Sequence, residues 1–307
     1  MRSAPPRIDD GVRRRLTSRF GAEAGPWFDE LPAVLSVLAE RWQVEFDSLI
    51  PRGSMSVVIR CWLTSGRPAV LKISPDRTRA KNEAAALDLW TTTHTPSVLA
   101  VDESAGALLI EAIEPGTPLA ESPTYPDMEI VVELLTSLHT TGVPNPSYPP
   151  LAFRIEHLFN SGTRPYERRP ELVDVVAPEL YERGRQLATR LVQGVAPTAL
   201  LHGDLTPNNI LDGGNQRGLV AIDPAPCLGD DLAFDAVDLL LWQASDVDII
   251  TARAEQLAPA IGVDAGRLLD WCIAFAGMVA LELAEAPDTA RNRMEAAVTL
   301  ADRAPKR

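Results

Sequence analysis

The chain has 307 residues, of which 46% are hydrophobic and 23% charged, an ordinary composition for a globular protein with a large core. Its net charge of −13 argues against a nucleic-acid partner and favours cationic ligands. We expect no transmembrane helix, no membrane partner and a cytoplasmic location, because no run of eighteen apolar residues and no signal-peptide pattern is present. The three cysteines are widely spaced and support neither a disulfide framework nor a zinc site.

The first 115 residues predict helices followed by a small antiparallel sheet. Apolar residues at helical spacing predict a helical extension over residues 1–45, with helices at 11–20 and 27–42. The period then changes to that of strands, and a further helix at 77–90 is expected to turn Leu87 and Trp90 inward. The expected strands cover residues 57–63, 69–73, 97–101 and 107–113.

The loop at 51–56 and the strand residue Lys72 are typical of a site for nucleotide phosphates. A turn-rich loop containing Ser54 can lie over the phosphates while Lys72 reaches their oxygens from the facing strand. The alternative for Lys72 is an exposed lysine at a strand edge. Glu83 precedes Leu87 by four residues on one helix face, so we predict an ion pair with Lys72; a surface glutamate paired with a nearby base is the alternative.

Residues 114–118 break the strand pattern, and this break separates an N-terminal lobe, 1–115, from a C-terminal lobe, 116–307. The second lobe is predicted to be mainly helical. The sequence therefore indicates a two-lobed α+β fold with a small antiparallel sheet in one lobe. The helices expected in the other lobe cover 127–140, 153–159, 171–191, a segment from about 231, 246–260, 264–283 and 288–302.

The stretch from His202 to Leu211 carries the pattern H-x-D-x-x-x-x-N, which is typical of a kinase catalytic loop. In that pattern Asp204 faces the hydroxyl nucleophile, while Asn209 and Asp223 hold magnesium against the phosphates. Ordinary turn chemistry is the alternative for a lone Asp or Asn. The complete spacing favours the kinase interpretation, and we assign His202 a structural role.

The segments 202–209, 222–224 and 229–235 resemble the aminoglycoside phosphotransferase family, especially its streptomycin 6-phosphotransferase-like branch of aminoglycoside and hydroxyurea resistance kinases. This resemblance implies a protein-kinase-like fold, use of ATP or GTP with Mg²⁺, and a streptomycin-like acceptor. It also implies that backbone groups of Glu111 to Ile113 bind adenine as a hinge.

The acceptor is expected to be small, because no room exists after Asp223 for a long peptide-docking segment. Residues after 115 carry 27 acidic and 15 basic side chains, a net −12, which favours a cationic acceptor. Solvated acids and helix caps are the alternatives, and bracing or capping is favoured for Asp235. The candidate substrate-binding residues are Asp230, Asp231, Asp235, Glu282 and Glu285.

Together these features predict a kinase that phosphorylates a hydroxyl group of a small, cationic aminoglycoside and confers antibiotic resistance. The alternative enzyme is a metabolic kinase for a sugar or amino sugar, because the same residues perform the same chemistry on either acceptor. A non-enzymatic, pseudokinase-like binding module is disfavoured because each expected polar residue is present. We expect a monomer or weak dimer.

Overall fold

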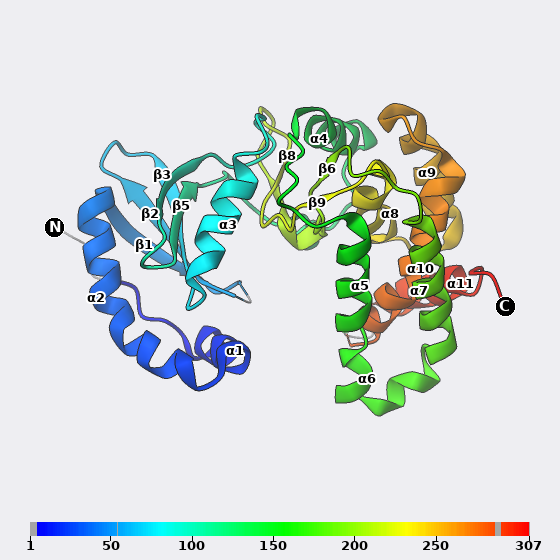
Figure 1. The fold of residues 1–307 in the computed structure, drawn as a ribbon, viewed down its shortest axis with the longest axis horizontal. Coiled ribbons are helices and arrows are strands. Elements are labelled where there is room, and N and C mark those ends of the chain that lie inside the picture. The colour runs from blue at the N-terminus through cyan, green and yellow to red at the C-terminus, as the bar shows by residue number, and fades with distance from the viewer. Residues whose placement is uncertain (1–4, 54, 286–289, 307) are drawn as a thin grey trace. The chain divides into compact units, whose positions relative to one another are not determined.

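The computed structural model describes residues 5–53, 55–285 and 290–306. The chain divides into two compact units, which Figure 1 shows with their labelled elements. The first contains residues 1–88 and 95–116, and the second contains 89–94 and 117–307. Across the described residues, no helix is long and apolar enough to span a membrane.

The first unit is built on a five-stranded antiparallel sheet with the order β1-β2-β3-β5-β4. The hairpin β2–β3 is in register over its whole length, so that Val58 lies opposite Lys72. Strand β3 also pairs with β5, which places Lys72 in the middle of the sheet rather than at an edge. The strands are β1 (Val44–Ile50), β2 (Val57–Leu63), β3 (Pro68–Ile73), β4 (Val98–Asp102) and β5 (Ala107–Glu111).

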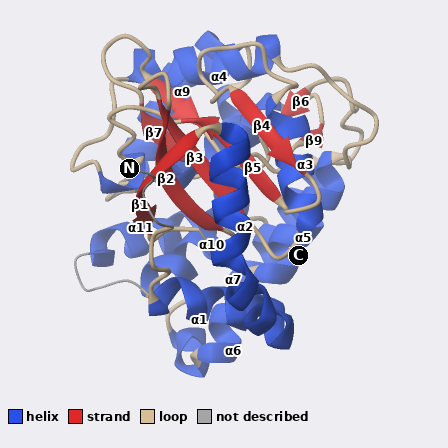
Figure 2. Cartoon of the chain, turned by 90° about the vertical axis from the view of Figure 1, so that its left-hand side faces the viewer, coloured by secondary structure: helices blue, strands red, loops and turns tan. Residues whose placement is uncertain are grey.

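Helices cover both faces of this sheet. Successive side chains along a strand point to opposite faces, so neighbouring strand residues contact different helices. Leu71 and Ile73 pack in the same cluster as the helices α1 (Asp10–Phe20) and α2 (Ala24–Trp42), and Figure 2 shows α2 lying across the strands. The opposite face carries α3 (Arg77–Leu87), which packs on side chains of β3, β4 and β5. Lys72, between Leu71 and Ile73, therefore points toward α3.

Helix α3 is shorter than predicted, and Trp90 lies in the second unit. The helix ends at Leu87, whereas the sequence pattern predicted residues 77–90. The Trp90 ring donates its Nε1 hydrogen to Leu138 O at 3.1 Å, and Trp90 forms an isolated bridge with Gly142. Residues 89–94, which the sequence assigned to the first lobe, pack with the second unit because of such contacts.

The second unit is mainly helical, and α10 runs through its core. The α10 residues from Trp271 to Leu281 are mostly buried, and they pack against α7, α8, α9 and α11. The helix predicted at 171–191 is instead a short 3₁₀ turn followed by α7, which starts at Pro178. The helices are α4 (Met128–Thr141), α5 (Leu151–Ser161), α6 (Arg164–Arg168), α7 (Pro178–Leu191), α8 (Val237–Leu241), α9 (Val247–Ile261), α10 (Ala265–Ala284) and α11 (Arg291–Ala301).

Candidate active site

A short hairpin places Asn209 and Asp223 at the same end of two paired strands. The strands β7 (Ile210–Asp212) and β8 (Leu219–Ala221) are antiparallel, with Ile210 opposite Ala221. The Ile222 N–H donates to Asn209 O at 2.8 Å and so extends this pairing by one step. Asp223 follows with φ 55°, in the left-handed region that non-glycine residues rarely adopt. Such backbone strain is common at functional sites.

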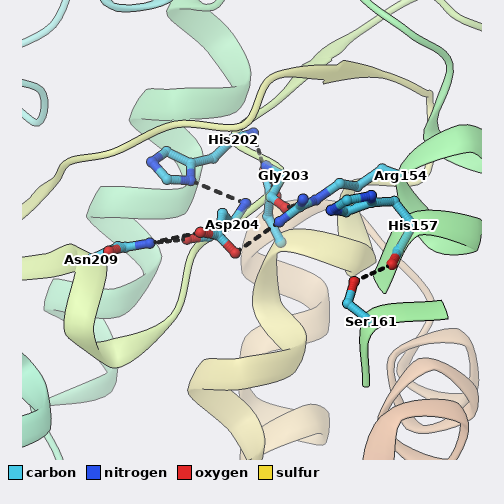
Figure 3. Close-up of polar contacts among 8 residues, drawn as sticks. Arg154, His157, Ser161, His202, Gly203, Asp204 and Asn209 are labelled. Carbon is cyan, nitrogen blue, oxygen red and sulfur yellow. Dashed lines mark hydrogen bonds and ion pairs between the residues drawn. The ribbon is translucent and has the colours of Figure 1, made fainter. Parts of the chain in front are cut away.

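Asp204 lies in the loop before this hairpin, and Figure 3 shows its carboxylate between Asn209 and Arg154. The Asn209 side chain donates to Asp204 O at 3.0 Å and to Asp204 Oδ2 at 2.9 Å. On the other side, Arg154 Nη2 donates to Asp204 Oδ1 at 2.8 Å. The Asp204 side chain is still 35% exposed, so a small molecule can reach it.

The main chain before Asp204 is held by the buried side chain of Asp235. The N–H groups of His202 and Gly203 donate to the Asp235 carboxylate at 2.8 and 3.0 Å, and His139 contacts it at 3.3 Å. Burial opposes ionisation of Asp235, but the hydrogen bond and charge of His139 hold the pKa of its carboxyl below the usual range. Burial also lowers the pKa of His202, so this ring is neutral near pH 7.

Gly203 allows the loop to approach the segment that follows Asp223. Its φ is 78°, and a Cβ atom there would lie 2.0 Å from Ala225 O. The Ala225 N–H donates to His202 O at 2.9 Å. Only glycine fits this position, which ties the loop of Asp204 to the segment of Asp223.

The first unit contains the predicted Lys72–Glu83 ion pair, with Nζ and Oε1 2.5 Å apart. The two side chains are only 9% and 8% exposed, so neither is a surface residue. A buried cation of this kind needs such a partner, which holds the Lys72 side chain over the α3 face of the sheet. The pair is present; its role in binding a nucleotide stays a prediction.

Three further positions were predicted to bind the nucleotide. Ser54 lies outside the described residues. The Glu111 N–H donates to Ser97 O at 2.9 Å, and a role of this residue in binding adenine stays a prediction. Ile113 is buried two residues after the end of β5.

Two of the acids predicted to bind substrate are committed to the protein core, and this corrects the prediction for them. Asp231 Oδ2 accepts hydrogen bonds from Arg267 Nε at 2.8 Å and from Trp271 Nε1 at 2.7 Å. Asp235 supports the loop of Asp204, the alternative that the sequence had favoured for it. Both carboxylates are buried with donors that compensate their charge, and neither is offered to a ligand.

The other predicted acids differ in position. Asp230 is exposed beside Arg267, near the start of α10. Glu282 is fifteen residues further along α10, which corresponds to about 22 Å of helix. Glu285 ends this helix and forms an exposed ion pair with Arg168 at 3.3 Å. The predicted acids therefore do not form one cluster.

The structure adds Asp238, which the sequence did not single out. Burial and the charges of Glu282 and Asp204 raise the pKa of Asp238 to about 7, while Arg154 opposes this shift. The Glu282 side chain is exposed, yet desolvation of its carboxylate and the charge of Asp204 raise its pKa as well. Asp238 and Glu282 therefore interact electrostatically with Asp204.

The groups at the end of the β7–β8 hairpin fit a divalent cation. Asn209 uses its amide nitrogen to bond Asp204, so its oxygen is the atom that can coordinate a cation together with the Asp223 carboxylate. Within residues 5–53, 55–285 and 290–306, no group of three or more His, Cys, Asp or Glu could hold a metal. One carboxylate and one amide suit Mg²⁺, which takes its other ligands from water and phosphates.

A sheet unit with a buried lysine–glutamate pair and a helical unit with this Asp-Asn-Asp arrangement define a small-molecule kinase related in fold to the protein kinases. The family model described as aminoglycoside/hydroxyurea antibiotic resistance kinase matches residues 41–286. The chain belongs to this family, whose members phosphorylate small molecules.

Individual proteins are similar to this chain in sequence or in fold. The chain is 26% identical over 283 residues to a streptomycin 6-kinase of Streptomyces griseus, covering 87% of each protein. A choline kinase from Streptococcus pneumoniae has a similar fold, with a TM-score of 0.57, 16% identity and coverage of 89% of this chain and 99% of that one. An amicoumacin kinase solved with AMP-PNP and Ca²⁺ gives a TM-score of 0.51, with 16% identity and coverage of 93% and 97%.

Proposed function

We propose that the protein transfers the γ-phosphoryl group of ATP or GTP, with Mg²⁺, to a hydroxyl group of a streptomycin-like aminoglycoside. The observation that carries this proposal is the Asp204 carboxylate, which Asn209 holds at 2.9 Å while its side chain stays accessible. The streptomycin 6-kinase similarity supports the acceptor, and the relative solved with AMP-PNP and Ca²⁺ supports the nucleotide and a divalent cation.

Each candidate residue has a role that follows from its chemistry. Asp204 orients the acceptor hydroxyl and accepts its proton, which leaves late in a loose phosphoryl-transfer transition state. Asn209 and Asp223 would hold Mg²⁺, which would neutralise charge on the phosphate oxygens. Lys72, held by Glu83, positions the phosphates of the nucleotide.

The carboxylates near Asp204 support a cationic acceptor. Asp238 and Glu282 both interact electrostatically with Asp204, so the site gains negative charge as Asp238 ionises above about pH 7. An ammonium or guanidinium group of the acceptor would be attracted by this charge, whereas a neutral sugar would not. This arrangement favours an aminoglycoside over an uncharged sugar.

The test is a screen of the purified protein for nucleotide consumption with streptomycin, other aminoglycosides and uncharged sugars. For the best aminoglycoside, kcat/KM should fall as added salt shortens the Debye length from about 10 Å to 3 Å, because salt screens attraction between exposed charges. A glucose-like neutral acceptor serves as the control and should respond little. A flat salt profile with streptomycin, or a preference for the neutral sugar, would contradict the proposed acceptor.

Asp238 should make capture of this acceptor pH-dependent. The pKa of its carboxyl is about 7, so the side chain is ionised above pH 7 and becomes neutral as pH falls below it. The KM for the cationic acceptor should therefore rise as the pH falls from 8 to 6. In Asp238→Asn the KM for the cationic acceptor should be about tenfold higher than in wild type at pH 8 and should change less with pH, because the side chain carries no charge at any pH.

The charged groups that shift the pKa of Asp238 are Glu282 on α10, Asp204 in its loop, Arg154 on α5 and Asp235. Glu282 also titrates above its usual range, so a part of the pH response should survive in Asp238→Asn. Asp248→Asn, at an exposed position on α9, is the matched control. An unchanged KM and pH profile in Asp238→Asn would exclude a role in acceptor capture.

A further inference from the structure

Arg154 joins helix α5 to the loop of Asp204 through two acceptors. Its Nε donates to Gly203 O at 2.6 Å, and its Nη2 donates to Asp204 Oδ1 at 2.8 Å. Figure 3 shows the guanidinium lying between these two atoms, opposite Asn209. The Arg154 side chain is 15% exposed, so water competes little for these bonds.

These bonds fix the orientation of the carboxylate as well as its position. Asn209 holds Oδ2 and Arg154 holds Oδ1, so rotation of the Asp204 side chain would break a bond at one oxygen or the other. The carbonyl of Gly203 belongs to a backbone segment that Asp235 already holds through two N–H groups. Arg154 therefore connects the fixed main chain to the proposed base, and charge assistance strengthens its contact with the carboxylate.

Helix α5 does not depend on Arg154 for its place in the fold. Leu151, Ile155 and Phe159 recur at intervals of four residues, and all three are buried in the main core. Arg154 lies off this stripe and directs its polar end to the loop. Its two hydrogen bonds thus tie the Asp204 carboxylate to a helix whose position is already set by packing.

The positive charge of Arg154 has a second effect, on the carboxylates that interact with Asp204. Asp204, Asp238 and Glu282 interact with one another as like charges, and Arg154 is the cation that opposes them at Asp238. A cation among like charges offsets their mutual repulsion. The guanidinium supplies that cation and donates to only one of the two oxygens of the Asp204 carboxylate.

We propose that Arg154 is a positioning residue for phosphoryl transfer, which holds the Asp204 carboxylate in the orientation that receives the acceptor hydroxyl. The proposal rests on the proposed function, because Arg154 acts through Asp204. Lysine would keep the positive charge but could not reproduce the planar, two-donor contact with Gly203 and Asp204. Charge and geometry can therefore be separated by substitution.

The experiment compares Arg154→Met, Arg154→Lys and wild type in steady-state assays with streptomycin and saturating nucleotide. We expect kcat to fall about a hundredfold in Arg154→Met, with the KM for nucleotide unchanged, since a misplaced reacting group costs roughly this factor. Arg154→Lys should recover a part of the loss, about tenfold, by restoring the charge alone.

Arg183→Met is the matched control for removing a similar arginine. Arg183 also bonds a carbonyl oxygen, of Ala304 at 2.9 Å, and a carboxylate, of Asp302 at 2.7 Å, and its side chain is also 15% exposed. It interacts with the C-terminal segment and not with Asp204. Its kcat should match that of wild type, and thermal unfolding of all variants checks that the fold is retained.

The outcomes separate this proposal from the proposed function. If wild type phosphorylates streptomycin and Asp204→Ala does not, the proposed function stands. Arg154→Met with a kcat within about threefold of wild type would then overturn the positioning role alone. A higher kcat/KM for the cationic acceptor in Arg154→Met would also overturn it, because Arg154 would then compete with the acceptor. In the double variant with Asp204→Ala, the Arg154 substitution should cause no further loss.

Discussion

Replacing Asp204 by alanine is expected to reduce turnover at least about a thousandfold while the protein remains folded and binds nucleotide. The carboxylate is the group that orients the hydroxyl and accepts its proton, and the two side chains that hold it cannot take its place. Asn209 and Arg154, which hold Asp204, are both hydrogen-bond donors to it and cannot act as a base. The measurement is kcat with streptomycin, together with nucleotide affinity by calorimetry.

Two further variants make this result specific. Asp204→Asn preserves the size of the side chain and should lose nearly as much turnover, because an amide cannot accept the hydroxyl proton. Asn208→Ala removes an exposed side chain from the same loop and should change turnover by no more than about twofold. Wild-type turnover in Asp204→Ala would contradict the assignment of this residue.

The parts of the site that could be predicted from sequence are those fixed by local geometry. Strand alternation decides that Lys72 points to the face opposite Leu71, and helix periodicity places Glu83 on the packed side of α3. Their ion pair follows once α3 covers that face. The spacing of Asp204 and Asn209 is likewise set within one turn, and their contact spans five residues.

The acidic residues after Asp223 could not be sorted from sequence, because their backbone is irregular. Residues 232–236 form a 3₁₀ turn that becomes α8 at Val237, so neither a period of 3.6 nor one of 2.0 applies throughout. Asp231 and Asp235 consequently turn into the core, while Asp238, one turn later, comes near Asp204. Tertiary contacts decide these directions.

A second limit of prediction from sequence is that residues far apart in the chain come into contact, as Arg154 and Trp90 do with their partners. Arg154 meets Asp204 across fifty residues, and nothing in the pattern around α5 marks it among other surface arginines. Trp90 continues the helical spacing of Leu87, yet α3 stops and the ring bonds Leu138 O in the second unit. The periodicity of a helix predicts which of its side chains are buried, but it does not predict which distant residue they contact.

Asp223→Ala is expected to abolish the magnesium-dependent part of nucleotide binding, and Asn209→Ala should weaken it less. A carboxylate contributes a full negative charge to a divalent cation, whereas an amide oxygen contributes only a dipole. The expected loss for Asp223→Ala is about a hundredfold in nucleotide affinity at saturating Mg²⁺, which corresponds to removing the main protein ligand. Titration of nucleotide by calorimetry with Mg²⁺, and again with a chelator, separates the metal-dependent part.

Asp212→Ala provides the control within the same hairpin, because Asp212 ends β7 and bonds the Gly214 N–H at 2.8 Å, away from the Asn209 end. It should retain magnesium-dependent affinity. The left-handed conformation at residue 223 is easier for Asp and Asn than for Ala, so Asp223→Asn, with nearly the same shape and backbone preference, tests charge alone. It should behave as Asp223→Ala does toward Mg²⁺. Equal, metal-independent affinity in wild type, Asp223→Ala and Asn209→Ala would show that these residues do not hold the cation.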